Sequence, residues 1–220
     1  MKEFIVTVDG PAGSGKSTIA KIVAKKYNFT YLDTGAMYRM IALYALENNV
    51  NLEDKNQVDK MLEDAKLDIK GNIFYLNGKD VSEAIRTPKV TGIVSVVAAI
   101  KEVRVKLVEM QRAISKGKQT ILDGRDIGTA VFPNAQVKIF LVASPETRAI
   151  RRLKEYEQKN ISTTYEEVLE GIKERDFIDS TRKESPLVKA VDAHEIDSSN
   201  MTVDEVVNAI SSFIDEKLEA

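Results

Sequence analysis

A glycine-rich segment near the start of the chain constrains its fold most strongly. Residues 10–17 read Gly-Pro-Ala-Gly-Ser-Gly-Lys-Ser and match the pattern GxxxxGK[ST]. An apolar run, Phe4–Val8, precedes the segment, and apolar residues recur at helical spacing from Lys16 onward. A strand, a glycine-rich loop and a helix, in that order, form the context in which this pattern binds phosphate. The sequence therefore predicts an α/β fold whose first loop binds a nucleotide.

Each residue type in this loop has a chemical role. Glycines let backbone amides wrap an anion, the helix N-terminus adds its dipole, and Lys16 can reach the outer phosphates. Asp123 follows an apolar strand, where a carboxylate can orient magnesium or its waters, although an aspartate there can also simply cap a turn. We expect Mg²⁺ at Ser17 and Asp123, and ATP at Gly10, Pro11, Ala12, Gly13, Ser14, Gly15, Lys16, Ser17 and Thr18.

The composition excludes several other kinds of site. The chain has no cysteine and one histidine, so disulfides, thiolate zinc sites and most histidine chemistry are ruled out. A formal net charge of −2 argues against general nucleic-acid binding. No stretch approaches the ~20 apolar residues of a membrane span, and no signal peptide is recognisable. We therefore expect a cytoplasmic protein that binds neither a membrane nor a nucleic-acid polymer, and a monomer is the default expectation.

Five short apolar runs alternate with helical patterns along the chain. This alternation is typical of a parallel sheet with helices on its faces. We therefore predict an α/β core with a five-stranded parallel sheet flanked by helices. Its strands are expected at Phe4–Val8, Phe29–Leu32, Thr120–Leu122, Val137–Val142 and His194–Ile196.

Two regions depart from this alternation. Residues 67–81 are interpreted as short antiparallel strands joined at Lys70-Gly71-Asn72 and at Asn77-Gly78, followed by a helix-rich stretch at residues 93–114. Further along, Ser144-Pro145 is predicted to begin a helix, and Thr163-Thr164-Tyr165-Glu166 to form the capping box of the next one. Residues 159–162 between these two helices have little to bury, which favours a mobile flap.

The arginines favour a kinase over a nucleotide switch. Five of ten arginines lie between Arg148 and Arg182, and Arg148, Arg151 and Arg152 share one helix face if that segment is helical. A solvated charged face is the alternative interpretation of that pattern. A GTPase switch would resemble an Asn-Lys-x-Asp motif, which does not occur, and the Asp-x-x-Gly spacing from Asp68 to Gly71 falls in the predicted hairpin.

The acceptor of a kinase without a histidine base can itself be a phosphate. A nucleoside monophosphate is largely dianionic near neutral pH, with a second pKa of about 6, so its oxygen can attack without losing a proton. Such a transfer needs charge neutralisation and alignment, which lysine, arginine and magnesium supply. Another P-loop small-molecule kinase, acting on a hydroxyl group, stays possible at this point, although it would normally need a carboxylate base.

Four segments together carry a resemblance to a known family. They are Asp9–Ser17, Tyr31–Arg39, Leu122–Thr129 and Glu174–Asp176. On these segments the chain resembles the bacterial cytidylate kinases, members of the nucleoside monophosphate kinase family, over nearly its whole length. The resemblance implies one P-loop kinase domain over residues 1–220, with an acceptor-binding insert at about residues 36–100 and a lid at about residues 150–164. It also implies phosphorylation of CMP and dCMP by ATP with Mg²⁺.

The resemblance also implies roles for individual side chains, most of which would alone be interpreted as surface or structural groups. Arg39 and Arg125 would hold the CMP phosphate, and Ser95, Arg104 and Asp126 the cytosine. Thr34, Asp179 and Arg182 would hold the rest of the acceptor. ATP would be served by Arg175 together with Arg148, Arg151 and Arg152. The residues expected to act in catalysis are Lys16, Arg39, Arg125, Arg151 and Arg175.

Overall fold

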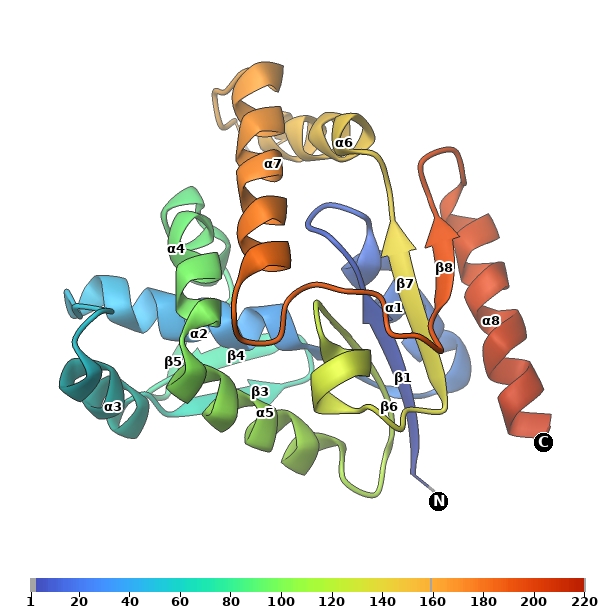
Figure 1. Cartoon of the computed structure of the whole chain (residues 1–220), viewed down its shortest axis with the longest axis horizontal. Helices are drawn as coiled ribbons and strands as arrows, with labels where there is room; N and C mark the ends of the chain where they lie inside the picture. Colours follow the sequence, from blue (N-terminus) through green and yellow to red (C-terminus); the bar gives the residue numbers. More distant parts are fainter. Residues whose placement is uncertain (1–2, 159, 220) are drawn as a thin grey trace. The chain divides into compact units, whose positions relative to one another are not determined.

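The computed structural model describes residues 3–158 and 160–219 and divides the chain into two units. The first unit consists of Met1–Leu32 and Ser115–Ala220, and the second consists of Asp33–Ile114. The chain thus leaves the first unit after its second strand and returns to it about 80 residues later. Each unit has a sheet of its own, and both are coloured by sequence in Figure 1.

A five-stranded parallel sheet forms the centre of the first unit, which confirms the predicted fold class. The strand order is β2-β6-β1-β7-β8, so the first strand lies in the middle. Strands β1 and β6 pair from Phe4 opposite Gln119 to Asp9 opposite Gly124. The strand bounds are β1 Phe4–Asp9, β2 Thr30–Asp33, β6 Gln119–Gly124, β7 Val137–Val142 and β8 His194–Asp197.

The two faces of β1 contact different neighbours, because successive side chains of a strand point to opposite sides. Phe4, Val6 and Val8 belong to the apolar core that includes residues of helices α1 (Lys16–Tyr27) and α8 (Val203–Glu219). Thr7 and Asp9 point to the other face, towards a short π-helix, η2 (Ile127–Val131). The phosphate loop therefore follows β1 directly in the sequence, and η2 lies beside the end of this strand.

Helices α6 (Pro145–Gln158) and α7 (Tyr165–Thr181) pack against each other (Figure 1). Ala149, Val168 and Ile172 form a buried apolar cluster between them. As predicted, α6 begins at Pro145, with the Ser144 hydroxyl accepting from the Thr147 amide.

The capping box of α7 was predicted one residue too early. It consists of Thr164 and Glu167, while the Thr163 hydroxyl donates to the same glutamate. Thr163 with Glu166 and Thr164 with Glu167 both match the complete capping-box pattern, so the sequence alone does not distinguish them. Of the predicted flap, Lys159 lies outside the described residues.

The second unit contains the predicted antiparallel strands, which form a three-stranded sheet in the order β3-β4-β5. Helix α2 packs against α3, α4, η1 and β4, so it forms the centre of this unit. The helix-rich stretch is two helices with a break at Ile100, and helix α3, capped by Asp54, was not predicted. The bounds are α2 Thr34–Glu47, α3 Lys55–Asp64, β3 Leu67–Lys70, β4 Ile73–Leu76, β5 Lys79–Asp80, η1 Ala84–Arg86, α4 Pro88–Ala99 and α5 Lys101–Ser115.

None of the helices within residues 3–158 and 160–219 is both long enough and apolar enough to cross a membrane.

Candidate active site

The phosphate loop lies between β1 and α1, where the sequence predicts it. Gly10 has a φ of +145°, and a Cβ atom there would overlap the backbone of Leu141 in β7, so only glycine fits. The Lys16 ammonium is buried and donates to the Pro11 carbonyl at 2.6 Å and to the Ser14 hydroxyl at 3.2 Å. The loop therefore curls around the lysine that is expected to reach the phosphates.

The electrostatic surroundings of Lys16 favour a polyanion. Burial lowers the pKa of its ammonium well below 10.5, and the nearby charge of Arg125 lowers it further, while Asp123 opposes both effects. Phosphate groups in the loop would supply the negative charge that raises this pKa again. The loop is therefore suited to bind a highly charged ligand such as a nucleoside triphosphate.

Ser17 and Asp123, expected to hold magnesium, lie together. The Ser17 hydroxyl donates to Oδ2 of Asp123 at 2.6 Å, and the Tyr31 hydroxyl donates to Oδ1 at 2.8 Å. Within the part of the chain that the structure describes, no group of three or more His, Cys, Asp or Glu side chains could hold a metal. One carboxylate and one hydroxyl fit Mg²⁺, which keeps several waters and is usually held by one or two carboxylates plus substrate phosphates.

Tyr31 was not predicted as part of this site. It lies in β2, whose neighbour in the sheet is β6, the strand that carries Asp123. The strand order that brings the two side chains together is not visible in the sequence. Two signals were available: Tyr31 opens one of the segments that carry the family resemblance, and it is close to the carboxyl end of a predicted strand, where parallel sheets bind ligands.

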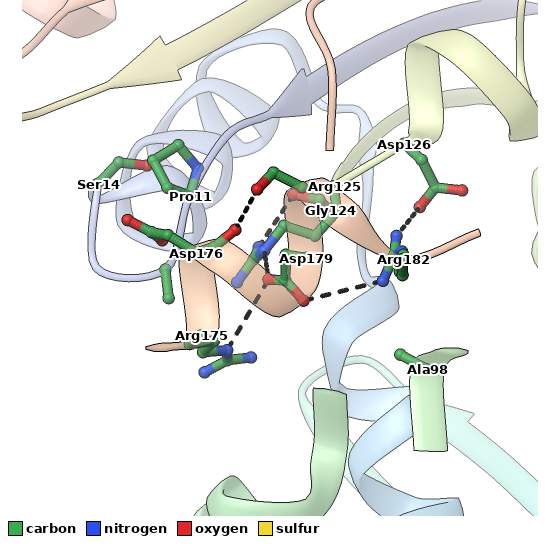
Figure 2. Close-up of polar contacts among 12 residues, drawn as sticks. Pro11, Ser14, Ala98, Gly124, Arg125, Asp126, Arg175, Asp176, Asp179 and Arg182 are labelled. Carbon is green, nitrogen blue, oxygen red and sulfur yellow. Dashed lines mark hydrogen bonds and ion pairs between the residues drawn. The ribbon is translucent and has the colours of Figure 1, made fainter. Parts of the chain in front are cut away.

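Three arginines lie around a buried carboxylate, that of Asp179 on α7 (Figure 2). Arg125 donates to it through Nε at 3.0 Å, and guanidinium nitrogens of Arg175 and Arg182 lie 3.9 Å from its oxygens. Burial alone would raise the pKa of Asp179, but the three arginines outweigh burial and hold the pKa below its usual value of 3.8. The carboxylate therefore stays ionised and fixes the arginines in place.

Asp126 pairs with Arg182 rather than with its neighbour in sequence. An oxygen of Asp126 lies 3.5 Å from Nη2 of Arg182 (Figure 2), and Arg182 also donates twice to the Ser185 carbonyl, at 2.9 and 2.7 Å. The adjacent Arg125 turns instead to Asp179. Burying an ion pair is costly unless its geometry is good. These four residues, all expected to bind the acceptor, lie in one cluster of alternating charge.

Arg148 and Arg151 of α6 contact the phosphate loop from outside. Arg148 is 2% exposed, donates to the Ala12 carbonyl at 3.1 Å, and forms a two-pronged pair with Asp176 at 3.0 and 2.6 Å. Arg151 lies 3.4 Å from the Ser14 carbonyl and donates to Ser198. Arg152 lies on the same face of α6, as its spacing predicts, but pairs with Glu155 at 2.9 Å. The three arginines are therefore in different surroundings.

In the second unit, helix α4 connects the expected acceptor residues. Arg39 of α2 donates to the Thr91 hydroxyl at 2.8 Å, and Arg104 of α5 donates to the Ala98 carbonyl at 3.1 Å. Thr91, Ser95 and Ala98 follow one another at spacings of four and three, which places them on one face of α4. Arg39, Ser95 and Arg104 are thus brought to the same helix face. Thr34 begins α2 and is buried.

Asp9, the residue before the loop, is a buried carboxylate that sequence reasoning did not assign a role. Its Oδ1 accepts from the Ile127 amide at 2.8 Å and its Oδ2 from the Gly128 amide at 2.7 Å. Burial raises the pKa of Asp9 to about 6, although these two amides and the charge of Lys16 lower it and Asp126 raises it. Burial therefore disfavours the ionised form of Asp9.

This pKa shift predicts how stability depends on pH. Between pH 3.8 and about 6 the folded state binds more protons at Asp9 than the unfolded state does, so stability falls as pH rises. The variant Asp9→Asn has no titratable group at residue 9. The wild-type unfolding free energy should fall by about 2 kcal/mol relative to that of the variant as pH rises from 4 to 7. Urea unfolding of both proteins across this range measures the effect, and parallel stability curves would contradict it.

A phosphate loop at the carboxyl edge of a parallel sheet, with a Ser-Asp pair beside its lysine and a nearby cluster of fixed arginines, is the arrangement of a P-loop kinase. Comparison with known proteins then identifies the family. The chain belongs to the cytidylate kinase family, because the sequence model described as "Cytidylate kinase" matches residues 6–216.

Individual relatives agree with this assignment. The chain is 59% identical over 216 residues to a cytidylate kinase of Fusobacterium nucleatum subsp. nucleatum, covering 98% of this chain and 99% of that protein. It is 51% identical over 214 residues to a cytidylate kinase of Clostridioides difficile, covering 97% and 99%. The fold is also similar to the crystal structure of an uncharacterized protein from Eubacterium ventriosum, with a TM-score of 0.56, 13% identity, and coverage of 97% and 99%.

Proposed function

We propose that this protein transfers the γ-phosphoryl group of ATP to the phosphate of CMP and dCMP, forming CDP and dCDP. The observation that carries the proposal is the cytidylate kinase family match across residues 6–216. The buried lysine of the phosphate loop and the clustered arginines supply the charge that such a transfer requires. A hydroxyl-directed kinase and a nucleotide switch are not favoured by this match.

In the proposed reaction, an oxygen of the dianionic CMP phosphate forms a bond to the γ-phosphorus of ATP. The bond from that phosphorus to the β,γ-bridging oxygen breaks, and ADP leaves with the electron pair. No side chain needs to remove a proton, because the attacking phosphate is already ionised near neutral pH. Lys16 would balance the charge on the outer phosphates, and Mg²⁺, held by Ser17 and Asp123 with the ATP phosphates, would neutralise further charge.

The resemblance to the cytidylate kinases implies the acceptor contacts, and the chemistry of the side chains supports them. Guanidinium groups bind phosphate through paired N–H donors, and a carboxylate accepts from an exocyclic amino group. Accordingly, Arg39 and Arg125 bind the CMP phosphate, Ser95, Arg104 and Asp126 bind cytosine, and Thr34, Asp179 and Arg182 complete the acceptor site.

The arginines near ATP have two kinds of role in this proposal. Arg151, Arg152 and Arg175 contact ATP phosphates during transfer. Arg148 instead holds the phosphate loop, since its guanidinium already donates to Ala12, Ala143 and Asp176. Residues 36–100 of the second unit form the acceptor-binding insert of a single kinase domain, and residues 150–164 form the lid. The proposed working form is a cytoplasmic monomer.

The direct test is an assay of ADP release, coupled to NADH oxidation, with a panel of acceptors. The panel contains CMP, dCMP, UMP, AMP and GMP together with unphosphorylated nucleosides and sugars. CMP and dCMP should give the highest catalytic efficiencies. Faster turnover with an unphosphorylated acceptor would reject the proposal.

We also expect ATP hydrolysis without an acceptor to be at least about a hundredfold slower than CMP-dependent turnover. Closure of the region from Arg148 to Arg182 over bound ATP would exclude water from the γ-phosphate. The measurement is ADP release with and without CMP at saturating ATP. Equal rates in the two conditions would defeat the idea that this region keeps water out.

A further inference from the structure

The Asp9 carboxylate connects two parts of the first unit that the sequence separates by more than a hundred residues. It is 5% exposed, and each of its oxygens accepts one amide proton, from Ile127 and from Gly128. Hydrogen bonds to a charged acceptor are among the stronger ones in proteins. In the sequence, Asp9 is followed directly by Gly10, the first residue of the phosphate loop.

The two amides belong to the segment that immediately follows Arg125 and Asp126. The Asp126 carbonyl accepts from the Ala130 amide at 2.8 Å, so η2 is held by Asp9 at its first two amides and closes its own first turn. Arg125 and Asp126 therefore directly precede the start of η2, whose position Asp9 fixes. Small shifts of the start of η2 would move both side chains relative to their partners Asp179 and Arg182.

Gly128 permits this close approach. A Cβ atom at Gly128 would lie 2.9 Å from the Thr7 hydroxyl, 3.2 Å from Cδ of Lys138 and 3.3 Å from Oδ2 of Asp9. Each of these separations is shorter than an ordinary carbon contact. A side chain at residue 128 would push η2 away from β1, so the chain has no room for one where the carboxylate reaches the amides.

Holding a turn with a buried carboxylate costs free energy, because burial disfavours the charged form. The Lys16 ammonium attracts its charge, but the Asp126 carboxylate repels it, and burial raises the pKa of Asp9. Buried charges of this kind are concentrated at functional sites. The two amides that Asp9 holds directly follow Arg125 and Asp126, the residues to which the proposed function assigns acceptor binding.

We propose that Asp9 is a positioning residue that sets the placement of Arg125 and Asp126 for the acceptor. This inference rests on the proposed function. Asp9 itself touches no substrate. The phosphate loop has other supports, because Lys16 donates to Pro11 and Arg148 donates to Ala12. Loss of the carboxylate should therefore disturb acceptor binding more than ATP binding.

The experiment compares the full chain with Asp9→Asn, Gly128→Ala and Thr7→Val. Asparagine keeps the size of aspartate but turns one acceptor into a donor, which then faces an amide N–H. Gly128→Ala displaces the same amides by another route and decides the test alone if Asp9→Asn does not fold. Thr7→Val is the matched control on the same face of β1, since its buried hydroxyl has no hydrogen-bond partner among the described residues.

We expect Asp9→Asn and Gly128→Ala to raise the KM for CMP about tenfold or more, and the KM for ATP less than about threefold. Thr7→Val should leave both constants within about twofold. A general loss of structure would raise both constants together, so a parallel rise, or no rise for CMP, overturns the positioning role.

Failure of the proposed function gives a different result, which is a wild-type protein without CMP-dependent turnover. Amide hydrogen exchange of Ile127 and Gly128 then decides the inference without any acceptor. In Asp9→Asn, faster exchange at these amides and altered arginine side-chain signals of Arg125 and Arg182 support positioning. Unchanged arginine signals in this variant overturn it.

Discussion

Replacing Lys16 with alanine is expected to lower kcat at least about a thousandfold. The ammonium is buried inside the phosphate loop, and a charge interaction is stronger at a buried site than in solution. Charge shifts towards the outer phosphates as the transition state forms, and no other lysine occurs in the loop. Steady-state kinetics with saturating ATP and CMP measure the loss.

The folded state should survive this change. A buried ammonium with a lowered pKa is not a large source of stability, and alanine leaves no charge behind. The control is Lys25→Ala, which removes an exposed lysine from the same helix and should leave kcat within about twofold. Full catalytic rate in Lys16→Ala would reject the role of the loop in transfer.

Replacing Asp126 with asparagine is expected to lower the ratio of catalytic efficiencies for CMP and UMP at least about tenfold. Cytosine presents an amino donor and a ring-nitrogen acceptor, whereas uracil presents a carbonyl acceptor and an N–H donor. In the proposed site, the carboxylate of Asp126 would accept from the amino group and repel the uracil carbonyl. Asparagine offers a donor as well, so uracil gains where cytosine loses.

The structure keeps one partner of Asp126 in place when the carboxylate is replaced. Arg182 also donates twice to the Ser185 carbonyl, so it keeps an anchor in the variant. Asp204→Asn, an exposed carboxylate in the first turn of α8, controls for the loss of one negative charge. If the efficiencies for CMP and UMP fall together in Asp126→Asn, the carboxylate aligns Arg182 and does not read the base.

The sequence predicted the fold well because the fold depends on local patterns. Buried parallel strands appear as short apolar runs, and the Asn77-Gly78 turn has the residue types that a tight hairpin requires. All five core strands and the small sheet were therefore found within a few residues. Helix α3 was missed because its amphipathic pattern is short and most of its surface is charged.

The site was only partly predictable, because its pairings are not local. The phosphate loop is a continuous motif, and Asp123 could be found as a carboxylate that follows a strand. The strand order that places Tyr31 against Asp123, and the choice of Arg125 to pair with Asp179 and not with Asp126, leave no mark in the sequence. The sequence shows Asp9 directly before the phosphate-loop motif. Only its contacts with Ile127 and Gly128, which the sequence does not show, distinguish it from an aspartate that simply ends a strand.

The central place of β1 in the sheet has a consequence for synthesis of the protein. Its two neighbours, β6 and β7, begin only at Gln119 and Val137, while the chain emerges from the ribosome N-terminus first. The second unit, which is continuous in sequence, can fold during this interval, whereas β1 must wait with both backbone edges unpaired. An unfinished chain that stops before β6 would thus carry an apolar strand open to other chains and a Ser17 without its carboxylate. Aggregation of the nascent chain before β6 emerges is therefore a hazard that this topology creates.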